Sequence, residues 1–258
     1  MLAILSPAKT LDFETPLTTK KFSEPEFVAE STELISHLRK LSPTDLSAKM
    51  KISDALAELN VQRYADWSPS FEPDAARPAI HAFKGDVYLG LDAPTLSARD
   101  HNYAQKHVRI LSGLHGLLRP LDRMRPYRLE MGTALKTKRG KDLYEFWGSK
   151  VTDALNTAIS ENNHRALINL ASNEYANVLH SDAIDARLIN VKFLDYKNGQ
   201  YKFMSFFGKR ARGSMARYMI DQRVKSLKQL REFDYDGYGF NEERSKGDNW
   251  VFTRKQAA

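Results

Sequence analysis

The chain has 258 residues, of which 42% are hydrophobic and 28% are charged, and it contains no cysteine. This composition excludes wholesale disorder, disulfides and thiolate metal centres. No apolar run approaches the ~18 residues that are needed to span a bilayer, so we expect no membrane partner. The absence of cysteine fits a reducing compartment, and we expect a cytoplasmic protein. The formal net charge of +7 favours partners that carry phosphate.

The basic residues are concentrated in two segments. The segment from Gln105 to Lys141 contains ten Lys and Arg residues and only two acidic residues. The segment from Lys202 to Arg217 contains five basic residues and no acidic one. Residues 12–60 and 232–248 are net acidic. This asymmetry predicts one positive surface, and the alternative is that the charges scatter over a solvated face once the chain folds.

The first part of the chain predicts a short strand and then helices. Residues 2–5 form an apolar strand, 12–25 a long polar loop, and 26–40 a helix with apolar residues at helical spacing. Ser42 and Ser53 are placed to cap two further helices, which predicts a helix-hairpin-helix-like element over about 42–64. The alternative is an ordinary helical hairpin in the core.

Strands and helices alternate in the remainder. The predicted elements are a turn at 84–86, a helix over 96–106 with Ser97 as its cap, a strand over 108–111, a helix over 142–159, a strand over 166–170, a hairpin over 188–207, a helix over 209–224 and an edge strand over 250–253. Asn198-Gly199 is a strong type I′ turn signal for the hairpin. This order predicts the α/β class (mixed α+β), with helices around one mixed β-sheet in a single domain over residues 1–258.

Ser6 and Lys9 formally match the S-x-x-K pattern, in which a lysine activates a serine nucleophile. That chemistry requires a helix, and Asp12 with Thr15-Pro16 leaves it no room. We therefore interpret Ser6, Lys9 and Thr10 as a loop at the end of a strand that can meet a phosphate or another polar ligand.

Gly113-Leu114-His115-Gly116 is a glycine turn that follows a predicted strand. Free amides at such a turn can hold an oxyanion, although the G-K-[ST] of a P-loop is missing. The seven histidines show no metal-ligand spacing, and we predict no metal and no cofactor.

Two basic stretches have the residue types of a nucleic-acid contact. Arg119, Arg123, Arg125 and Arg128 lie in a loop restrained by prolines beside a tyrosine, and Lys209, Arg210, Arg212 and Arg217 lie on one predicted helix. Arginine forks suit phosphate oxygens, and an aromatic ring can stack on a base. The alternatives are structural ion pairs in the loop and a solvated face on the helix.

Several contiguous motifs in fixed order are more specific than any single pattern above. They are Ser6–Asp12, Phe83–Tyr88, Leu111–Asp122, Pro126–Gly132, Asn169–Ser172 with Glu174 and Tyr175, and Ala211–Gly213 with Met215 and Arg217. On these motifs the chain resembles the YaaA family of bacterial peroxide-stress proteins from end to end.

The resemblance implies a mixed α/β domain of unusual topology that binds duplex and branched DNA through a positively charged cleft and a helix-hairpin-helix. It also implies a part in protecting DNA, or in limiting free iron, under peroxide stress. The hairpin maps onto residues 42–64, where the turn Lys51-Ile52-Ser53 departs from the family pattern because it lacks glycine.

The sequence thus supports two functions. The first is a DNA-binding protein without sequence specificity, with phosphate contacts from Arg119, Arg123, Arg125, Arg128, Lys209, Arg210, Arg212 and Arg217, and from Lys49 and Lys51 of the hairpin. The second is an enzyme that acts on a phosphorylated or nucleotide-like small molecule in the same cleft. Its pocket candidates, with Arg128, are Ser6, Lys9, Lys84, Asp86, Glu130 and Glu174, and no catalytic residue is assigned.

Overall fold

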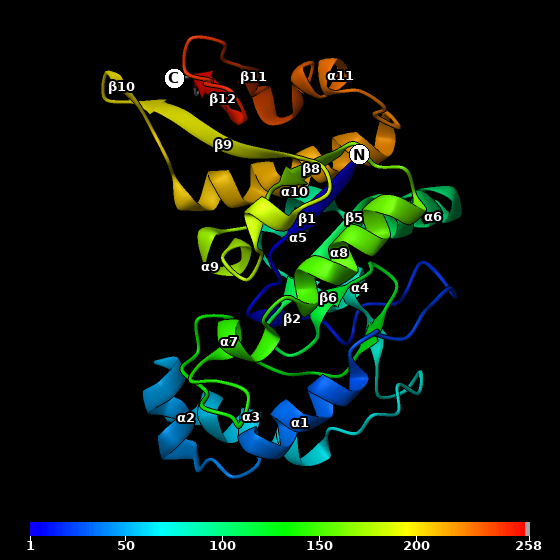
Figure 1. The fold of residues 1–258 in the computed structure, drawn as a ribbon, viewed down its shortest axis with the longest axis vertical. Coiled ribbons are helices and arrows are strands. Elements are labelled where there is room, and N and C mark those ends of the chain that lie inside the picture. The colour runs from blue at the N-terminus through cyan, green and yellow to red at the C-terminus, as the bar shows by residue number, and fades with distance from the viewer. Residues whose placement is uncertain (256–258) are drawn as a thin grey trace.

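A buried parallel strand, β1 (Leu2–Leu5), lies at the centre of the main sheet between β5 and β8. Its four apolar residues do not alternate with polar ones, as expected for a strand that is covered on both faces. The computed structural model describes residues 1–255, and Figure 1 shows helices on both sides of this sheet. The predicted class is therefore confirmed: a single α/β domain with a mixed sheet.

The main sheet has eight strands in the order β11-β12-β9-β8-β1-β5-β6, with β10 paired to β9. The bounds of its other strands are β5 (Val108–Ser112), β6 (Gly116–Leu118), β8 (Ala166–Asn169), β9 (Arg187–Lys197), β10 (Gln200–Lys202), β11 (Gly239–Phe240) and β12 (Asn249–Lys255). The strands from β12 to β5 are parallel, whereas β6, β10 and β11 pair antiparallel. Two short ladders lie outside it: β2 (Thr10–Leu11) with β4 (Phe83–Lys84), and β3 (Arg77–Pro78) with β7 (Arg123–Met124).

The helices fall into two groups. Figure 1 shows α1, α2 and α3 together at one end of the molecule, while α5, α8 and α10 lie near the sheet. The bounds are α1 (Val28–Leu38), α2 (Pro43–Met50), α3 (Asp54–Asp66), α4 (Ala79–Ala82), α5 (Asp86–Leu91), α6 (Ala98–His107), α7 (Leu143–Trp147), α8 (Lys150–Glu161), α9 (Asn173–Ala176), α10 (Ser205–Asp221) and α11 (Leu227–Arg231), with short 3₁₀ turns at 93–95, 181–183 and 235–237. Across residues 1–255 no helix is long and apolar enough to cross a membrane.

The helix caps and the hairpin turn that the sequence predicts are present in the structure. Ser42 caps α2 and Ser97 caps α6, each in a reciprocal pair with an aspartate three residues on. Asn198 and Gly199 have φ angles of 53° and 80°, which is the left-handed pair that a type I′ turn requires.

Three boundaries differ from the prediction. The helix expected over 142–159 is broken into α7 and α8 at Gly148, whose φ of +50° ends the first helix. The helix expected from Lys209 begins one turn earlier, at Ser205. The strand expected at an edge is β12, which is interior because it pairs with β9 on one side and with β11 on the other.

Candidate functional site

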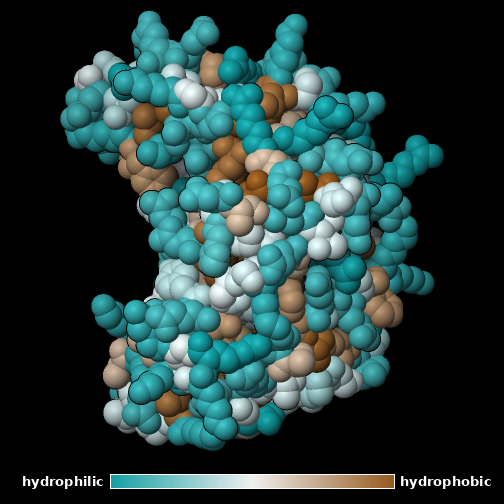
Figure 2. All heavy atoms as spheres, viewed as in Figure 1, coloured by the Kyte–Doolittle hydropathy of each residue, from teal (hydrophilic) through white to brown (hydrophobic). Residues whose placement is uncertain are grey.

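A polar cleft of about 490 Å³ lies at the carboxyl ends of β1 and β8. Four segments contribute its walls: residues 6–10 after β1, 84–87 between β4 and α5, 172–175 at α9, and Lys209 with Arg212 on α10. Figure 2 shows the left edge of the molecule hollowed between the positions of α9 and α7 in Figure 1. Open parallel sheets build their ligand sites at this edge, because the loops that follow the strands converge there.

Ser6 joins two of these walls. Its Oγ accepts the backbone N–H of Ser172 at 2.8 Å, and its carbonyl oxygen accepts the hydroxyl of Tyr88 at 3.1 Å. Ser6 is buried. It therefore holds the floor of the cleft together and does not present a free hydroxyl as a nucleophile would.

Four cations face the cleft, and they differ in their partners. Lys9 Nζ lies 3.3 Å from Glu130 Oε1, and Lys84 Nζ lies 3.3 Å from Asp12 Oδ2, but both lysine side chains stay more than half exposed. Over residues 1–255, Lys209 and Arg212 form no ion pair. Two cations are thus available to an external anion, and two more are only loosely held at the surface.

Arg212 is the most informative of the four. Its side chain is half-buried on α10, and this burial lowers the pKa of the guanidinium below its usual range. Its guanidinium carbon lies 5.9 Å from the ring centre of Phe203. A half-buried cation without a carboxylate partner is costly unless an anion compensates for its lost hydration. Arg212 is therefore suited to bind a ligand anion.

Acidic groups line the same region. Glu130 is buried beside the cleft, and its Oε1 accepts two hydrogen bonds from Arg128 at 2.8 and 3.1 Å. Its Oε2 is also buried and has no hydrogen-bond partner within the described residues. Glu174 accepts the N–H of Gly132 at 3.1 Å, and Asp86 begins α5. The six pocket candidates from the sequence thus come together, five in the cleft and Glu130 in a small cavity that shares Lys9 and Tyr175 with it.

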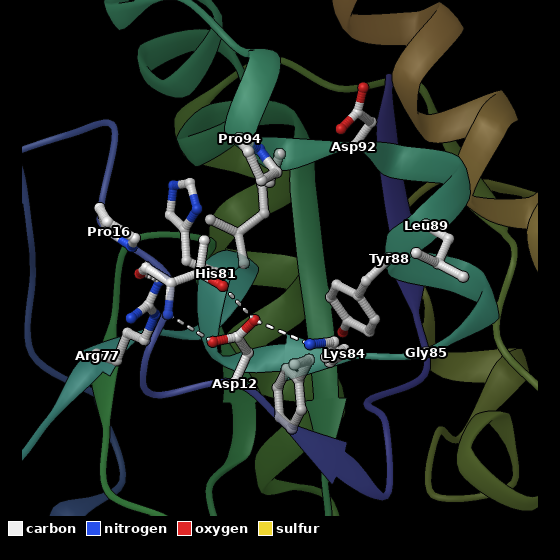
Figure 3. A pocket seen from close by; sticks show the side chains of 14 residues that line it. Asp12, Pro16, Arg77, His81, Lys84, Gly85, Tyr88, Leu89, Asp92 and Pro94 are labelled. Carbon is white, nitrogen blue, oxygen red and sulfur yellow. Dashed lines mark hydrogen bonds and ion pairs between the residues drawn. The ribbon is translucent and has the colours of Figure 1, made fainter.

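A second hollow of about 170 Å³ adjoins the cleft, because Lys84 and Gly85 line both (Figure 3). Hydrogen bonds from the backbone and hydroxyl of Thr15 hold the pKa of Asp12 well below its usual range. His81 Nε2 lies 2.9 Å from His101 Nε2. Burial, with the neighbouring His101 and Arg77, lowers the pKa of His81 to about 4. Its imidazole is therefore neutral at pH 7.

Three of the four predicted loop arginines lie away from the cleft, in contacts with the chain itself, while the fourth, Arg128, binds Glu130 beside the cleft. Arg119 Nε donates to Asp122 Oδ1 at 2.9 Å, Arg123 donates to the carbonyl of Phe71, and Arg125 donates to that of Ser70. None of these three arginines lines the cleft. Their guanidinium groups connect loops of the protein to one another. This arrangement is the structural role that the sequence analysis gave as the alternative to a nucleic-acid contact.

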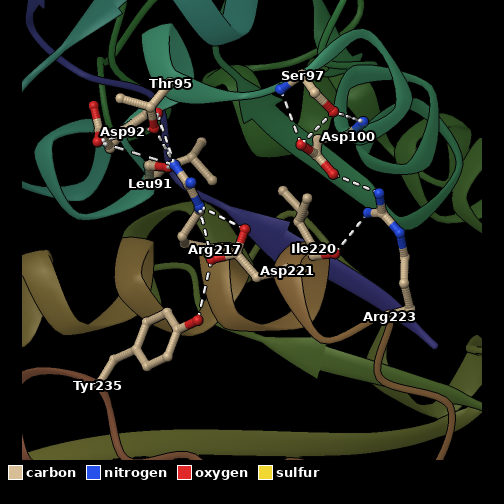
Figure 4. A network of polar contacts seen from close by, with 10 residues as sticks. All are labelled: Leu91, Asp92, Thr95, Ser97, Asp100, Arg217, Ile220, Asp221, Arg223 and Tyr235. Carbon is tan, nitrogen blue, oxygen red and sulfur yellow. Dashed lines mark hydrogen bonds and ion pairs between the residues drawn. The ribbon is translucent and has the colours of Figure 1, made fainter.

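Two of the predicted helix cations are also engaged. Figure 4 shows Arg217 between α10 and the segment after α5, where its Nε lies 2.8 Å from Asp221 Oδ1 and its Nη1 donates to the carbonyl of Asp92 at 3.0 Å. Arg210 lies 3.9 Å from Asp236. Only Lys209 and Arg212 of that group line the cleft.

The helical hairpin is present as α2 and α3, joined at 51–53. Lys51 adopts a left-handed φ of 52°, a conformation that favours glycine, and its N–H and that of Ile52 both donate to the carbonyl of Ser47. The two amides are therefore not free for a phosphate. Lys49 and Lys51 are exposed, and their contact with DNA stays a prediction.

The anion site expected at Gly113–Gly116 is wrong. All four residues are buried, and the N–H of His115 donates to Ser112 Oγ at 2.9 Å. A Cβ on Gly113 would lie 2.3 Å from the carbonyl oxygen of Leu129, so this glycine serves a close approach of two backbones.

Tyr175 also lines the cleft, although we did not choose it from the sequence as a site residue. It lies in one of the contiguous motifs beside Glu174, and that position was the only signal for it. Burial raises the pKa of its hydroxyl well above the usual range, so the group stays protonated. Across the described residues no cluster of three or more His, Asp or Glu side chains is arranged to hold a metal ion.

The fold and site define an α/β protein whose cleft, at the carboxyl ends of parallel strands, gathers lysine and arginine with the carboxylates of Asp86 and Glu174, and the buried Glu130 lies beside it. The sequence model of the family described as peroxide stress protein YaaA matches residues 1–244. The chain therefore belongs to this family, which implies a part in the response to peroxide stress.

Proposed function

We propose that this protein binds DNA without sequence specificity, with the phosphate backbone held in the polar cleft. The observation that carries the proposal is the pair Lys209 and Arg212, two cations on one helix that face the cleft without an acidic partner in the described residues. Lys9 and Lys84 line the same cleft from two other segments of the chain. Four cations around one cleft match the even negative charge of a phosphate backbone.

The charge of the whole chain supports the same partner. A net charge of +7 draws a polyanion toward the surface, while the cleft supplies the local contacts. Backbone contacts alone read no sequence, and the family resemblance implies binding to duplex and branched DNA, whose shared feature is the phosphate backbone. Lys49 and Lys51 on the helical hairpin provide a second contact in this proposal.

A salt titration tests the proposal directly. Binding of a labelled duplex, single strand and four-way junction is measured over a range of salt concentrations. The four cations of the cleft alone predict a log–log slope near −3.6 for duplex, at about −0.9 per contact, and contacts from Lys49 and Lys51 make the slope steeper. Arg212→Gln and Lys209→Gln each remove about one contact from the slope and weaken binding on any sequence.

Lys228→Gln is the matched control, because it removes the same charge from an exposed position on α11, outside the cleft. It should leave the slope nearly unchanged. Equal effects of all three variants would show that only net charge matters, and salt-independent binding would overturn the proposal.

One observation favours a second function, an enzyme that acts on a phosphorylated or nucleotide-like small molecule. Within the described residues Glu130 Oε2 is buried without a hydrogen-bond partner, while Oε1 of the same carboxylate lies 3.3 Å from the Lys9 ammonium, where a carboxylate can exchange a proton with a bound substrate. Glu130→Gln should then abolish turnover of such a substrate and leave DNA affinity unchanged. If this variant weakens DNA binding as strongly as Arg212→Gln, Glu130 serves the cleft only as a structural partner of Lys9 and Arg128.

A further inference from the structure

We propose that Phe203 and Phe206 form a stacking platform for unpaired nucleobases beside the polar cleft, so that the preferred DNA carries unpaired bases. This inference rests on the proposed DNA binding and adds what that binding leaves open, namely how the protein would distinguish one DNA shape from another.

The two rings are unusually exposed for their type. Phe203 and Phe206 each keep 54% of their surface exposed, whereas most phenylalanines of this chain are buried or half-buried. Phe203 lies between β10 and α10, and Phe206 lies in the first turn of α10. In Figure 1 this part of the chain lies at the left, above α9, on the edge that Figure 2 shows as hollowed. The rings therefore face solvent close to the cleft.

Contacts along α10 connect the rings to the cleft. Arg212 lines the cleft and also lies over the Phe203 ring, with 5.9 Å between the guanidinium carbon and the ring centre. Lys209 lines the cleft and follows Phe206 by three residues, which places the two side chains on neighbouring turns of one helix face. A phosphate bound by Lys209 and Arg212 therefore brings the adjoining nucleotides within reach of both rings.

The surrounding charge selects the partner. Between residues 196 and 220 the chain has six basic residues and no acidic one. A second copy of this chain would bring the same positive charge against the patch and be repelled, whereas a nucleic acid supplies phosphates for the cations and flat bases for the rings. Aromatic rings interleaved with cations are the usual surface for single-stranded nucleic acid, because every base offers a face for stacking.

Duplex DNA cannot use the rings in this way, since its bases are stacked on one another. The cations should therefore bind duplex and single strand alike, while the rings should add affinity only where bases are unpaired. This separation makes the platform testable independently of the cleft.

The experiment compares three labelled DNAs of equal length: a duplex, a single strand, and a duplex with an internal bubble. Phe203→Ala and Phe206→Ala should each weaken binding of the single strand and the bubble by about tenfold and change duplex binding less than about twofold. The salt slope should not change, because no phosphate contact is lost. A 2-aminopurine in the bubble should be quenched by the wild-type protein and less so by Phe206→Ala.

Phe206→Trp should retain single-strand binding, because it preserves a stacking face, and Phe203→Leu provides a second variant with little risk to folding. Phe22→Ala is the matched control: Phe22 is 52% exposed beneath Arg123, in the loop before α1 and outside the cleft. It should change none of the three affinities.

The outcomes separate this inference from the proposed function. If DNA binding depends on salt and is weakened by Arg212→Gln, but neither phenylalanine variant has an effect, the platform is overturned. The proposed binding of DNA in the cleft is then still supported. Equal losses on duplex and single strand also overturn it. Absence of DNA binding by the wild-type protein overturns both, and a change in oligomeric state caused by Phe206→Ala would identify the patch as a protein interface instead.

Discussion

Gly213 on α10 packs against the carbonyl oxygen of Val87 on α5 so closely that a Cβ at Gly213 would lie 1.7 Å from that oxygen. On the other helix, a Cβ at Gly90 would lie 2.1 Å from the carbonyl oxygen of Arg210. The two helices therefore touch through their backbones. Because Lys84 precedes α5 and Arg212 lies on α10, this contact sets the spacing between the two segments that carry these cations to the cleft.

Gly213→Ala should destabilise the protein and weaken its binding to DNA. Alanine favours an isolated helix by about 1 kcal/mol over glycine, but here the methyl group forces α5 and α10 apart. Overpacking of this kind costs about 1–3 kcal/mol or more, so the net change should be a loss of stability. Urea denaturation measures it.

Gly239→Ala is the matched control for that variant. A Cβ at Gly239 meets no atom within 4 Å, so its unfolding midpoint should barely move. A Gly213→Ala protein that is as stable as the wild type would contradict the close helix contact.

Ser6→Ala should loosen the floor of the cleft. The variant removes the 2.8 Å acceptor of the Ser172 N–H, which is half-buried at the wall of the cleft, and this costs about 1 kcal/mol. Thermal unfolding and amide exchange at Ser172 measure the loss. Ser36→Ala on α1 is the control, since Ser36 is exposed and bonds only within its own helix. It should change stability by less than ~0.5 kcal/mol.

Features that depend on neighbours in sequence could be predicted. The caps at Ser42 and Ser97 and the turn at Asn198-Gly199 need only a few adjacent residues to form, and each forms where the sequence places it. The apolar run at residues 2–5 predicted a strand for the same reason, whereas its central place in the sheet is known only from the structure. The carboxyl end of that strand then identified the region of the cleft.

The choice among the cations could be predicted only in part. Asp122 and Asp221 lie three and four residues after Arg119 and Arg217, with which they pair, but other partners are distant in sequence. Arg125 meets the carbonyl of Ser70, and Arg217 meets the segment at Asp92, more than a hundred residues away. No local pattern reveals these distant contacts, or that Arg212 is not engaged. The exposure of Phe203 and Phe206 could not be predicted either, because apolar residues in a predicted hairpin are expected to face a core.

Arg254→Ala should be strongly destabilising. Asp195 is fully buried on β9, and its carboxylate accepts Arg254 Nε at 2.5 Å and the hydroxyl of Tyr238 at 3.0 Å. Removing the guanidinium leaves a buried charge with one neutral partner, which costs about 3–5 kcal/mol. Arg187→Ala is the comparison, because the Arg187–Asp248 pair is about half exposed and should contribute at most ~1 kcal/mol. Similar losses in the two variants would contradict the buried pair.

Stability should fall as the pH is lowered from about 6.5, and His115 should account for part of that fall. The imidazole is fully buried, with Nδ1 2.9 Å from Ser31 Oγ, and burial lowers its pKa to about 3. In the unfolded chain the same group takes up a proton near pH 6.5. Between these two values the unfolded chain binds more protons than the folded one, so acid favours unfolding by up to about 1.4 kcal/mol per pH unit.

His115→Leu removes this titrating group and keeps an apolar side chain in the same place. Urea denaturation at pH 7, 6, 5 and 4.5 should then show a shallower decline for the variant than for the wild type. His81 and His164, whose pKa values burial lowers to about 4, should maintain the remaining slope in the variant. Parallel pH profiles would mean that the pKa of His115 is the same in the folded and the unfolded chain, and would contradict a buried imidazole that stays neutral in acid.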